Sequence, residues 1–149
     1  MSKDLRLATS EDLPALLLLV MEAQKETPFN LPFSAERVLQ VLNELLQNGI
    51  VICYIRNDQI AGLICGLTTY TPASLELIAA ELLWYVHPDH RKSRGALKLM
   101  DAFEYWAWTK GCSAVTIGNI ANTKMDATGK LYERKGYRLV EQSYMKNLK

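Results

Sequence analysis

Apolar residues along the chain follow two spacings, one typical of helices and one typical of strands. Apolar positions three and four residues apart predict amphipathic helices, and they occur at residues 10–25, 34–48, 93–110 and 125–135. Alternating or densely β-branched runs predict strands, and they occur at residues 5–8, 50–55, 60–69, 75–86, 114–117 and 137–148. The predicted order is β-α-α-β-β-β-α-β-α-β, an α/β arrangement in which an antiparallel meander precedes the crossovers.

Residues that cap helices or form turns mark the boundaries of these elements. Ser34 is a suitable helix cap, and the pair Asn48-Gly49 is expected to close the same helix in a left-handed conformation. Residues 56–59 separate two apolar runs and predict a hairpin. The short run at 114–117 has the composition of a strand that is buried on both faces.

Composition and charge exclude several classes of protein. The 17 basic and 16 acidic residues give a net charge of +1, which is too little for a protein held on nucleic acid by bulk electrostatics. No apolar run approaches the roughly 20 residues that cross a bilayer, and the first residues lack the pattern of a signal peptide. Three cysteines without paired spacing favour reduced thiols. We therefore expect one cytoplasmic domain, residues 1–149, that binds neither nucleic acid nor membrane.

The segment from Val86 to Ala96 has the strongest chemical signal, because it lies where a predicted strand ends and a predicted helix begins. Free backbone N–H groups and the helix dipole make such a position favourable for an anion. Gly95 and Ala96 are small enough to let a phosphate approach the backbone. Three cationic side chains surround this point, namely Arg91, Lys92 and Arg94. Because cations oppose the dipole at a helix start, their presence favours a bound anion over an ordinary solvated surface.

Three stretches of the sequence resemble the GNAT (general control nonderepressible 5-related) N-acetyltransferases. They are VHPDHRKSRGALKLM (86–100), LRLATSEDLPAL (5–16) and LYERKGYRLVE (131–141). The first is similar to the family's pyrophosphate-binding segment, V-x-P-x-x-R-G-x-G-x-G/A. The resemblance implies a mixed, mostly antiparallel sheet flanked by about four helices, acetyl transfer from acetyl-CoA to an amine by direct attack in a ternary complex, and a homodimer.

The resemblance also implies roles for individual residues. The pyrophosphate would lie on backbone amides of the loop, and the pantetheine arm along the end of the preceding strand. These positions are Ser93, Arg94, Gly95 and Ala96, with Arg91 at the loop start, and Trp84, Tyr85 and Val86 on the strand. Tyr132 matches the tyrosine that the family places near the thioester sulfur. The chain departs from the family pattern at three positions: Lys92 and Arg94 replace glycines, and Met125 replaces an asparagine for which Asn119 and Asn122 are the nearby candidates.

Glu81 is the candidate general base. An amine must lose a proton to attack a thioester, and Glu81 lies among apolar neighbours on the strand that ends at Val86. Burial there would raise its pKa and suit it to relay a proton through water. The alternative is an exposed position on the solvent face of the strand, and Glu76 is a rival carboxylate. Tyr132 would stabilise the leaving thiolate through a hydrogen bond.

Metal binding is not expected, whereas the acceptor is only broadly defined. His87 and His90 have no third ligand nearby, and Pro88 prevents their helical presentation. The acceptor is an amine of a small molecule or a protein, and the apolar residues of the 27–33 loop predict an apolar wall for it. The alternative function is a non-catalytic module that binds acyl-CoA or a protein partner, which the two replaced glycines favour.

Overall fold

The computed structural model describes residues 1–118 and 125–149. Within these residues, five strands form one sheet in the order β1-β2-β3-β4-β5. The strands are β1 (Leu5–Leu7), β2 (Ile50–Arg56), β3 (Gln59–Tyr70), β4 (Leu77–Val86) and β5 (Ala114–Thr116). The helices are η1 (Ser10–Asp12), α1 (Leu13–Lys25), α2 (Ala35–Asn48), η2 (Pro88–His90), α3 (Gly95–Thr109) and α4 (Met125–Arg134). Neighbouring strands are antiparallel except β4 and β5, which are parallel. The expected fold class is confirmed. None of the described helices has the length and apolar composition of a membrane span.

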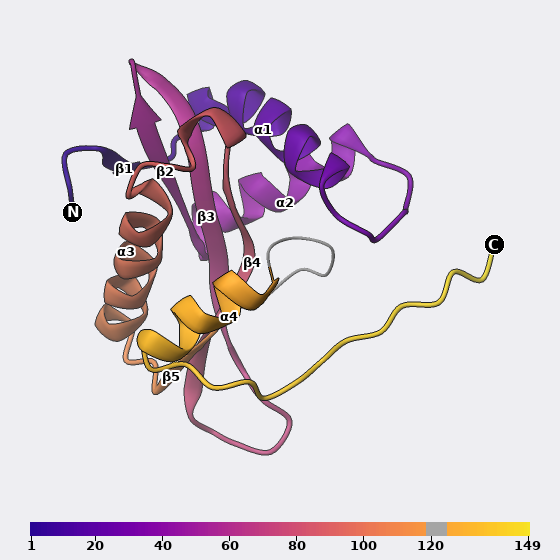
Figure 1. Ribbon diagram of the computed structural model, residues 1–149, viewed down its shortest axis with the longest axis vertical. Coiled ribbons are helices and arrows are strands. Elements are labelled where there is room, and N and C mark those ends of the chain that lie inside the picture. Colours follow the sequence, from indigo (N-terminus) through magenta and orange to yellow (C-terminus); the bar gives the residue numbers. More distant parts are fainter. Residues whose placement is uncertain (119–124) are drawn as a thin grey trace.

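Helices cover both faces of the sheet (Figure 1). α1 and α2 lie on one face and α3 on the other, and α4 lies on the α3 side because its Tyr132 ring stacks on Trp84. Along β2, Val51 and Cys53 pack with α1 and α2, whereas Tyr54 packs with α3. This strand is therefore buried on both faces, which explains why its sequence is apolar throughout rather than alternating.

Most turn and cap signals in the sequence predict the local geometry correctly. Residues 57–58 have positive φ angles of 51° and 61°, as a two-residue hairpin turn requires. Ser34 caps α2, since its hydroxyl accepts a hydrogen bond from the Arg37 N–H at 3.2 Å. The left-handed closure at Gly49 is wrong, because its φ is −133°. Glycine is needed there for another reason: a Cβ would lie 2.4 Å from the carbonyl oxygen of Gly66.

β4 and β5 separate part-way along β4. β5 pairs with β4 only at residues 78–80. Across residues 81–86, the side of β4 that faces β5 has no strand partner in the described residues. The prediction that β5 is buried on both faces is wrong, because Ala114 and Thr116 are exposed on a strand at the edge of the sheet.

The predicted terminal strand is also wrong, because residues 137–149 form no strand. Apolar residues occur there in adjacent pairs, Leu139-Val140 and Tyr144-Met145. In a strand, such neighbours point to opposite faces, so neither face would be consistently apolar. The segment instead leads away from the sheet (Figure 1), and Leu139 and Val140 are 77% and 73% exposed.

Candidate active site

The predicted anion site lies beyond the open end of β4, at the first turn of α3. α3 begins at Gly95, slightly later than the sequence pattern predicts. The first turn of a helix has unpaired N–H groups and a partial positive charge. Lys92 and Arg94 are exposed on the loop just before it. The loop therefore places two cationic side chains beside a helix start, which is a favourable arrangement for a phosphate.

Tyr54 on β2 holds this loop in place through a hydrogen bond, and the sequence analysis did not identify it. Its hydroxyl donates to Ser93 Oγ at 2.9 Å, and Ser93 Oγ donates to the His90 carbonyl at 2.6 Å. Gly95 lies directly against the same ring, since a Cβ there would be 2.2 Å from Tyr54 Cε1. A tyrosine within the apolar run of β2 was the available signal, because a buried tyrosine hydroxyl usually needs a partner.

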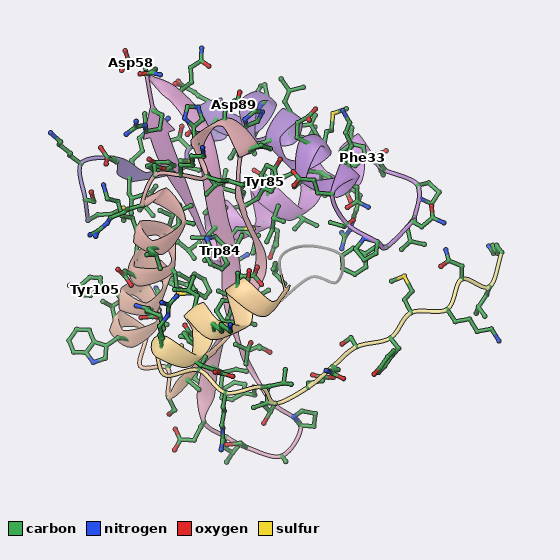
Figure 2. All side chains as sticks on the ribbon, viewed as in Figure 1. Phe33, Asp58, Trp84, Tyr85, Asp89 and Tyr105 are labelled. Atoms are coloured by element: carbon green, nitrogen blue, oxygen red, sulfur yellow. The ribbon has the colours of Figure 1, made fainter. Side chains whose placement is uncertain are left out.

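Trp84 and Tyr85 leave β4 toward opposite faces of the sheet, Trp84 toward α4 and Tyr85 toward α1 (Figure 2). The Trp84 indole N–H donates to the Ala96 carbonyl at 3.2 Å, and its ring centroid lies 6.0 Å from that of Tyr132. Trp84 therefore connects the open part of β4 with the first turn of α3 and with α4.

Arg91 is held on the α1 side of the loop. Its Nε donates to the Val86 carbonyl at 2.8 Å, and its Nη2 lies 2.8 and 2.9 Å from the two carboxylate oxygens of Glu26. The Tyr85 hydroxyl donates to the same carboxylate at 2.6 Å. These hydrogen bonds direct Arg91 to α1 and β4 rather than to the amides of residues 93–96. Sequence reasoning missed Glu26, because no local pattern links it to residues so distant in the chain.

Glu81 and Tyr132 both form a hydrogen bond with the backbone of Gly118. The Gly118 N–H donates to Glu81 Oε2 at 3.3 Å, and the Tyr132 hydroxyl donates to the Gly118 carbonyl at 2.6 Å. Glu81 directly follows the last β4 residue that pairs with β5, and Tyr132 comes from α4. The fold therefore brings two candidate catalytic residues together where β4 and β5 separate.

Burial changes the protonation of both groups. It raises the pKa of the Glu81 carboxyl to about 7, although the hydrogen bond from the Gly118 N–H opposes this. Burial, together with the charge of Glu81, raises the pKa of the Tyr132 hydroxyl above its ordinary value. Near neutral pH, Glu81 is suited to accept a proton, and Tyr132 remains a donor. Glu81 is half-buried, whereas the rival Glu76 is exposed and bonded to Ser113.

Two other predictions concern asparagines and metals. Asn119 and Asn122 lie outside the described residues. In residues 1–118 and 125–149, no three side chains of His, Cys, Asp or Glu form a group that can hold a metal ion.

Comparison with family models shows to which family the chain belongs. Residues 47–139 match the model described as "Acetyltransferase (GNAT) domain", and this range is more than half of the chain. The chain belongs to the GNAT acetyltransferase family. The resemblance found in the sequence is therefore confirmed, and the matched range includes the open end of β4 and the loop before α3. No match was found among curated protein sequences.

Solved structures share the GNAT fold over almost the whole chain. A predicted acetyltransferase with acetyl-CoA from Clostridium acetobutylicum has a TM-score of 0.78 at 13% identity, covering 97% of this chain and 95% of that one. A ribosomal-protein-alanine N-acetyltransferase from Brucella melitensis has a TM-score of 0.76 at 18% identity, covering 97% and 98%. An aminoglycoside acetyltransferase from an uncultured soil metagenomic sample, in complex with sisomicin, has a TM-score of 0.69 at 19% identity, covering 96% and 95%. At these identities the likeness shows the fold alone.

Proposed function

We propose that this GNAT protein transfers an acetyl group from acetyl-CoA to an amine, by direct attack in a ternary complex. The observation that carries the proposal is that Glu81 and Tyr132 both form a hydrogen bond with the Gly118 backbone, where β4 and β5 separate. A group able to accept a proton and a group able to donate a hydrogen bond therefore lie beside one residue. The attacking amine needs the proton acceptor, and the leaving sulfur is stabilised by the hydrogen-bond donor.

The donor is held by backbone groups. The pyrophosphate lies on the N–H groups of residues 93–96, with Lys92 and Arg94 beside them, and the pantetheine arm lies along the backbone of residues 84–86. Two observations support this placement. The β5 side of β4 lacks a strand partner there in the described part of the chain, and the hydrogen bond from Tyr54 to Ser93 fixes the loop.

The reaction then proceeds in one attack. The amine nitrogen bonds to the thioester carbon, the carbon–sulfur bond breaks, and the sulfur leaves as a thiolate that takes its proton from solvent. The proton lost by the amine passes through water to Glu81. Tyr132 exchanges its hydrogen bond to the Gly118 carbonyl for one to the leaving sulfur. Its raised pKa keeps the hydroxyl protonated for this purpose, and a donor aimed at developing charge lowers the barrier.

The acceptor is an amine of a small molecule or of a protein, with an apolar body. Structural relatives include a ribosomal-protein-alanine N-acetyltransferase and an enzyme bound to sisomicin, so the fold serves both classes of acceptor. In this chain, residues 27–34 of the connection between α1 and α2 have no charged side chain, and Glu26 is the one charged residue at its start. Phe29, Leu31 and Phe33 are exposed on it, and they favour an apolar acceptor.

The protein acts as one domain, residues 1–149, in the cytoplasm, and forms a homodimer. Three free cysteines suit a reducing compartment; they are Cys53, Cys65 and Cys112. Exposed apolar side chains support self-association, since Trp108 is 73% exposed and residues 139–140 are comparably open.

Calorimetry with CoA and with acetyl-CoA, followed by an amine screen with thiol release as readout, tests the proposal. We expect binding of both nucleotides and turnover with at least one amine that has an apolar body. Binding without turnover on any amine would favour the non-catalytic module, which the replacement of two loop glycines by Lys92 and Arg94 supports. Absence of CoA binding would overturn both functions.

A further inference from the structure

One carboxylate joins the two sides of the proposed site. Glu26 follows the last residue of α1 and begins the connection to α2. Its oxygens accept hydrogen bonds from the Tyr85 hydroxyl at 2.6 Å and from Arg91 Nη2 at 2.8 and 2.9 Å. Three separate parts of the chain, α1, β4 and the loop before α3, therefore meet at this side chain.

Further contacts fix the orientation of Arg91. Its Nε donates to the Val86 carbonyl, and its guanidinium lies over the Tyr85 ring, 5.2 Å from the centroid. A single exposed ion pair contributes little to stability, but here one guanidinium is held by a carboxylate, a backbone carbonyl and an aromatic ring. Burial opposes ionisation of Glu26, yet the hydrogen bonds from Tyr85 and Arg91 outweigh it and lower its pKa. The carboxylate is therefore ionised and the pair is charged at neutral pH.

The two residues of this ion pair, Glu26 and Arg91, lie beside the proposed sites of different substrates. Glu26 begins the connection that exposes Phe29, Leu31 and Phe33, the proposed acceptor side. Arg91 begins the loop that runs to the proposed phosphate-binding amides. Figure 2 shows Tyr85 directed toward α1, and Phe33 just before α2. Glu26 and Arg91 therefore join the start of the acceptor connection to the end of β4.

We propose that Glu26 is a positioning residue that fixes the acceptor side of the site through Arg91 and Tyr85. This inference rests on the proposed acetyl transfer. Glu26 touches neither substrate; it holds the start of the α1–α2 connection against the end of β4. The donor amides do not depend on it, because Tyr54 and the hydrogen bond of Ser93 to the His90 carbonyl hold that loop independently. Loss of Glu26 should therefore weaken mainly the binding of the amine acceptor.

The Glu26→Gln variant tests this inference. It keeps the shape of the side chain and an oxygen that accepts the hydrogen bond from the Tyr85 hydroxyl, but it removes the negative charge that holds Arg91. We expect faster hydrogen exchange of the amides of residues 26–34, without faster exchange at residues 93–96. We expect the acceptor KM to rise about tenfold, with kcat and the dissociation constant of CoA within about twofold of wild type. Glu22→Gln is the matched control in the last turns of α1, where Glu22 pairs with Lys25; it should change none of these quantities.

Two further variants keep the inference testable. Tyr85→Phe removes one hydroxyl from the carboxylate and should raise the acceptor KM in the same direction by a smaller factor. Arg91→Gln should match Glu26→Gln, and the double variant should be no worse than either, because the two residues act as one unit. Additive effects, or a Glu26→Gln enzyme that behaves like Glu22→Gln, would overturn the inference.

The outcome for CoA separates this inference from the proposed function. If Arg91→Gln weakens CoA binding by about tenfold or more while exchange at residues 26–34 is unchanged, Arg91 serves the phosphate and the inference is wrong. If wild-type protein does not bind CoA, the proposed function fails. The exchange of residues 26–34 in the free protein then still decides whether Glu26 holds the connection.

Discussion

At the residue scale, Glu81 is a carboxyl group whose surroundings disfavour its charge. Its folded pKa of about 7 lies above the ordinary value of 4.5. Between these values the folded chain holds a proton that the unfolded chain has released, so the free energy of unfolding should fall as pH rises through this interval. Glu81→Gln should remove this fall. Urea unfolding at about pH 5 and about pH 8 measures it, with Glu133→Gln, an exposed residue of α4, as control. An unchanged pH dependence in the Glu81 variant would show that the carboxyl titrates normally.

Glu81 should also shape the rate of acetyl transfer. Because the ionised form accepts the proton, kcat/KM of wild type should rise with pH and inflect near its pKa, about 7. Glu81→Gln should lose this inflection and retain only the rise that belongs to the acceptor amine. The pH profile of thiol release with a fixed amine measures both. A variant with wild-type rate and wild-type profile would exclude Glu81 as the base and leave water in that role.

Tyr132→Phe removes a single hydroxyl. Turnover should fall by roughly 10²-fold if this hydroxyl stabilises the leaving sulfur, while the dissociation constant of acetyl-CoA hardly changes. The lost hydrogen bond to Gly118 should cost about 1 kcal/mol of stability. Tyr137→Phe is the matched control, since its ring lies 5.8 Å from that of Tyr132 and its hydroxyl binds Glu104 instead. Equal turnover in the two variants would refute a role for Tyr132.

At the element scale, the start of α3 is the proposed binding site for the pyrophosphate of CoA. Arg94→Glu reverses a charge beside the N–H groups proposed to bind it and should weaken CoA binding by on the order of 10²-fold, with the fold retained. Arg37→Glu makes the same change in the first turn of α2, where Arg37 is also exposed, and should have no effect. Calorimetry with CoA checks both. If Arg94→Glu binds CoA normally, the phosphate lies elsewhere.

A substitution of Gly95 cannot replace Arg94→Glu as a test of where the phosphate binds. The Tyr54 ring occupies the space of any side chain at this position, and Tyr54 is almost fully buried. A substitution there would disturb the contact between β2 and α3 before it affected a ligand. The glycine that the sequence suggests for phosphate approach is thus required by packing as well.

At the scale of the whole molecule, exposed apolar surface favours the formation of a homodimer. The rings of Tyr105 and Trp108 on α3 lie 6.0 Å apart between centroids, and both side chains are exposed. Figure 2 shows Tyr105 on the outer side of α3. We expect light scattering at tens of micromolar to give the mass of two copies, the commonest closed assembly. Trp108→Glu should give monomers, whereas Leu75→Glu, which changes an equally open residue between β3 and β4, should not. A monomer mass for wild type would contradict the dimer.

Local pattern accounts for much of this protein. Helical spacing, the Ser34 cap and the turn at residues 57–58 depend on residues that are close in sequence, so the sequence by itself determines them. The three stretches at residues 5–16, 86–100 and 131–141 together likewise indicate the GNAT family before any contact is known. Glu81 and Tyr132 are candidates from the sequence, because their residue types and positions suffice to propose acid and base chemistry.

Tertiary structure decided what depends on distances between remote segments. The raised pKa of Glu81 and its meeting with Tyr132 at Gly118 need β4, α4 and the end of β5 in one place. The contacts of Glu26 with Arg91, and of Tyr54 with Gly95, join segments that share no local pattern. The strand predicted after α4 also depended on a remote segment. A strand forms only where a partner strand satisfies its backbone hydrogen bonds, and the sequence of residues 137–148 does not show whether such a partner is present.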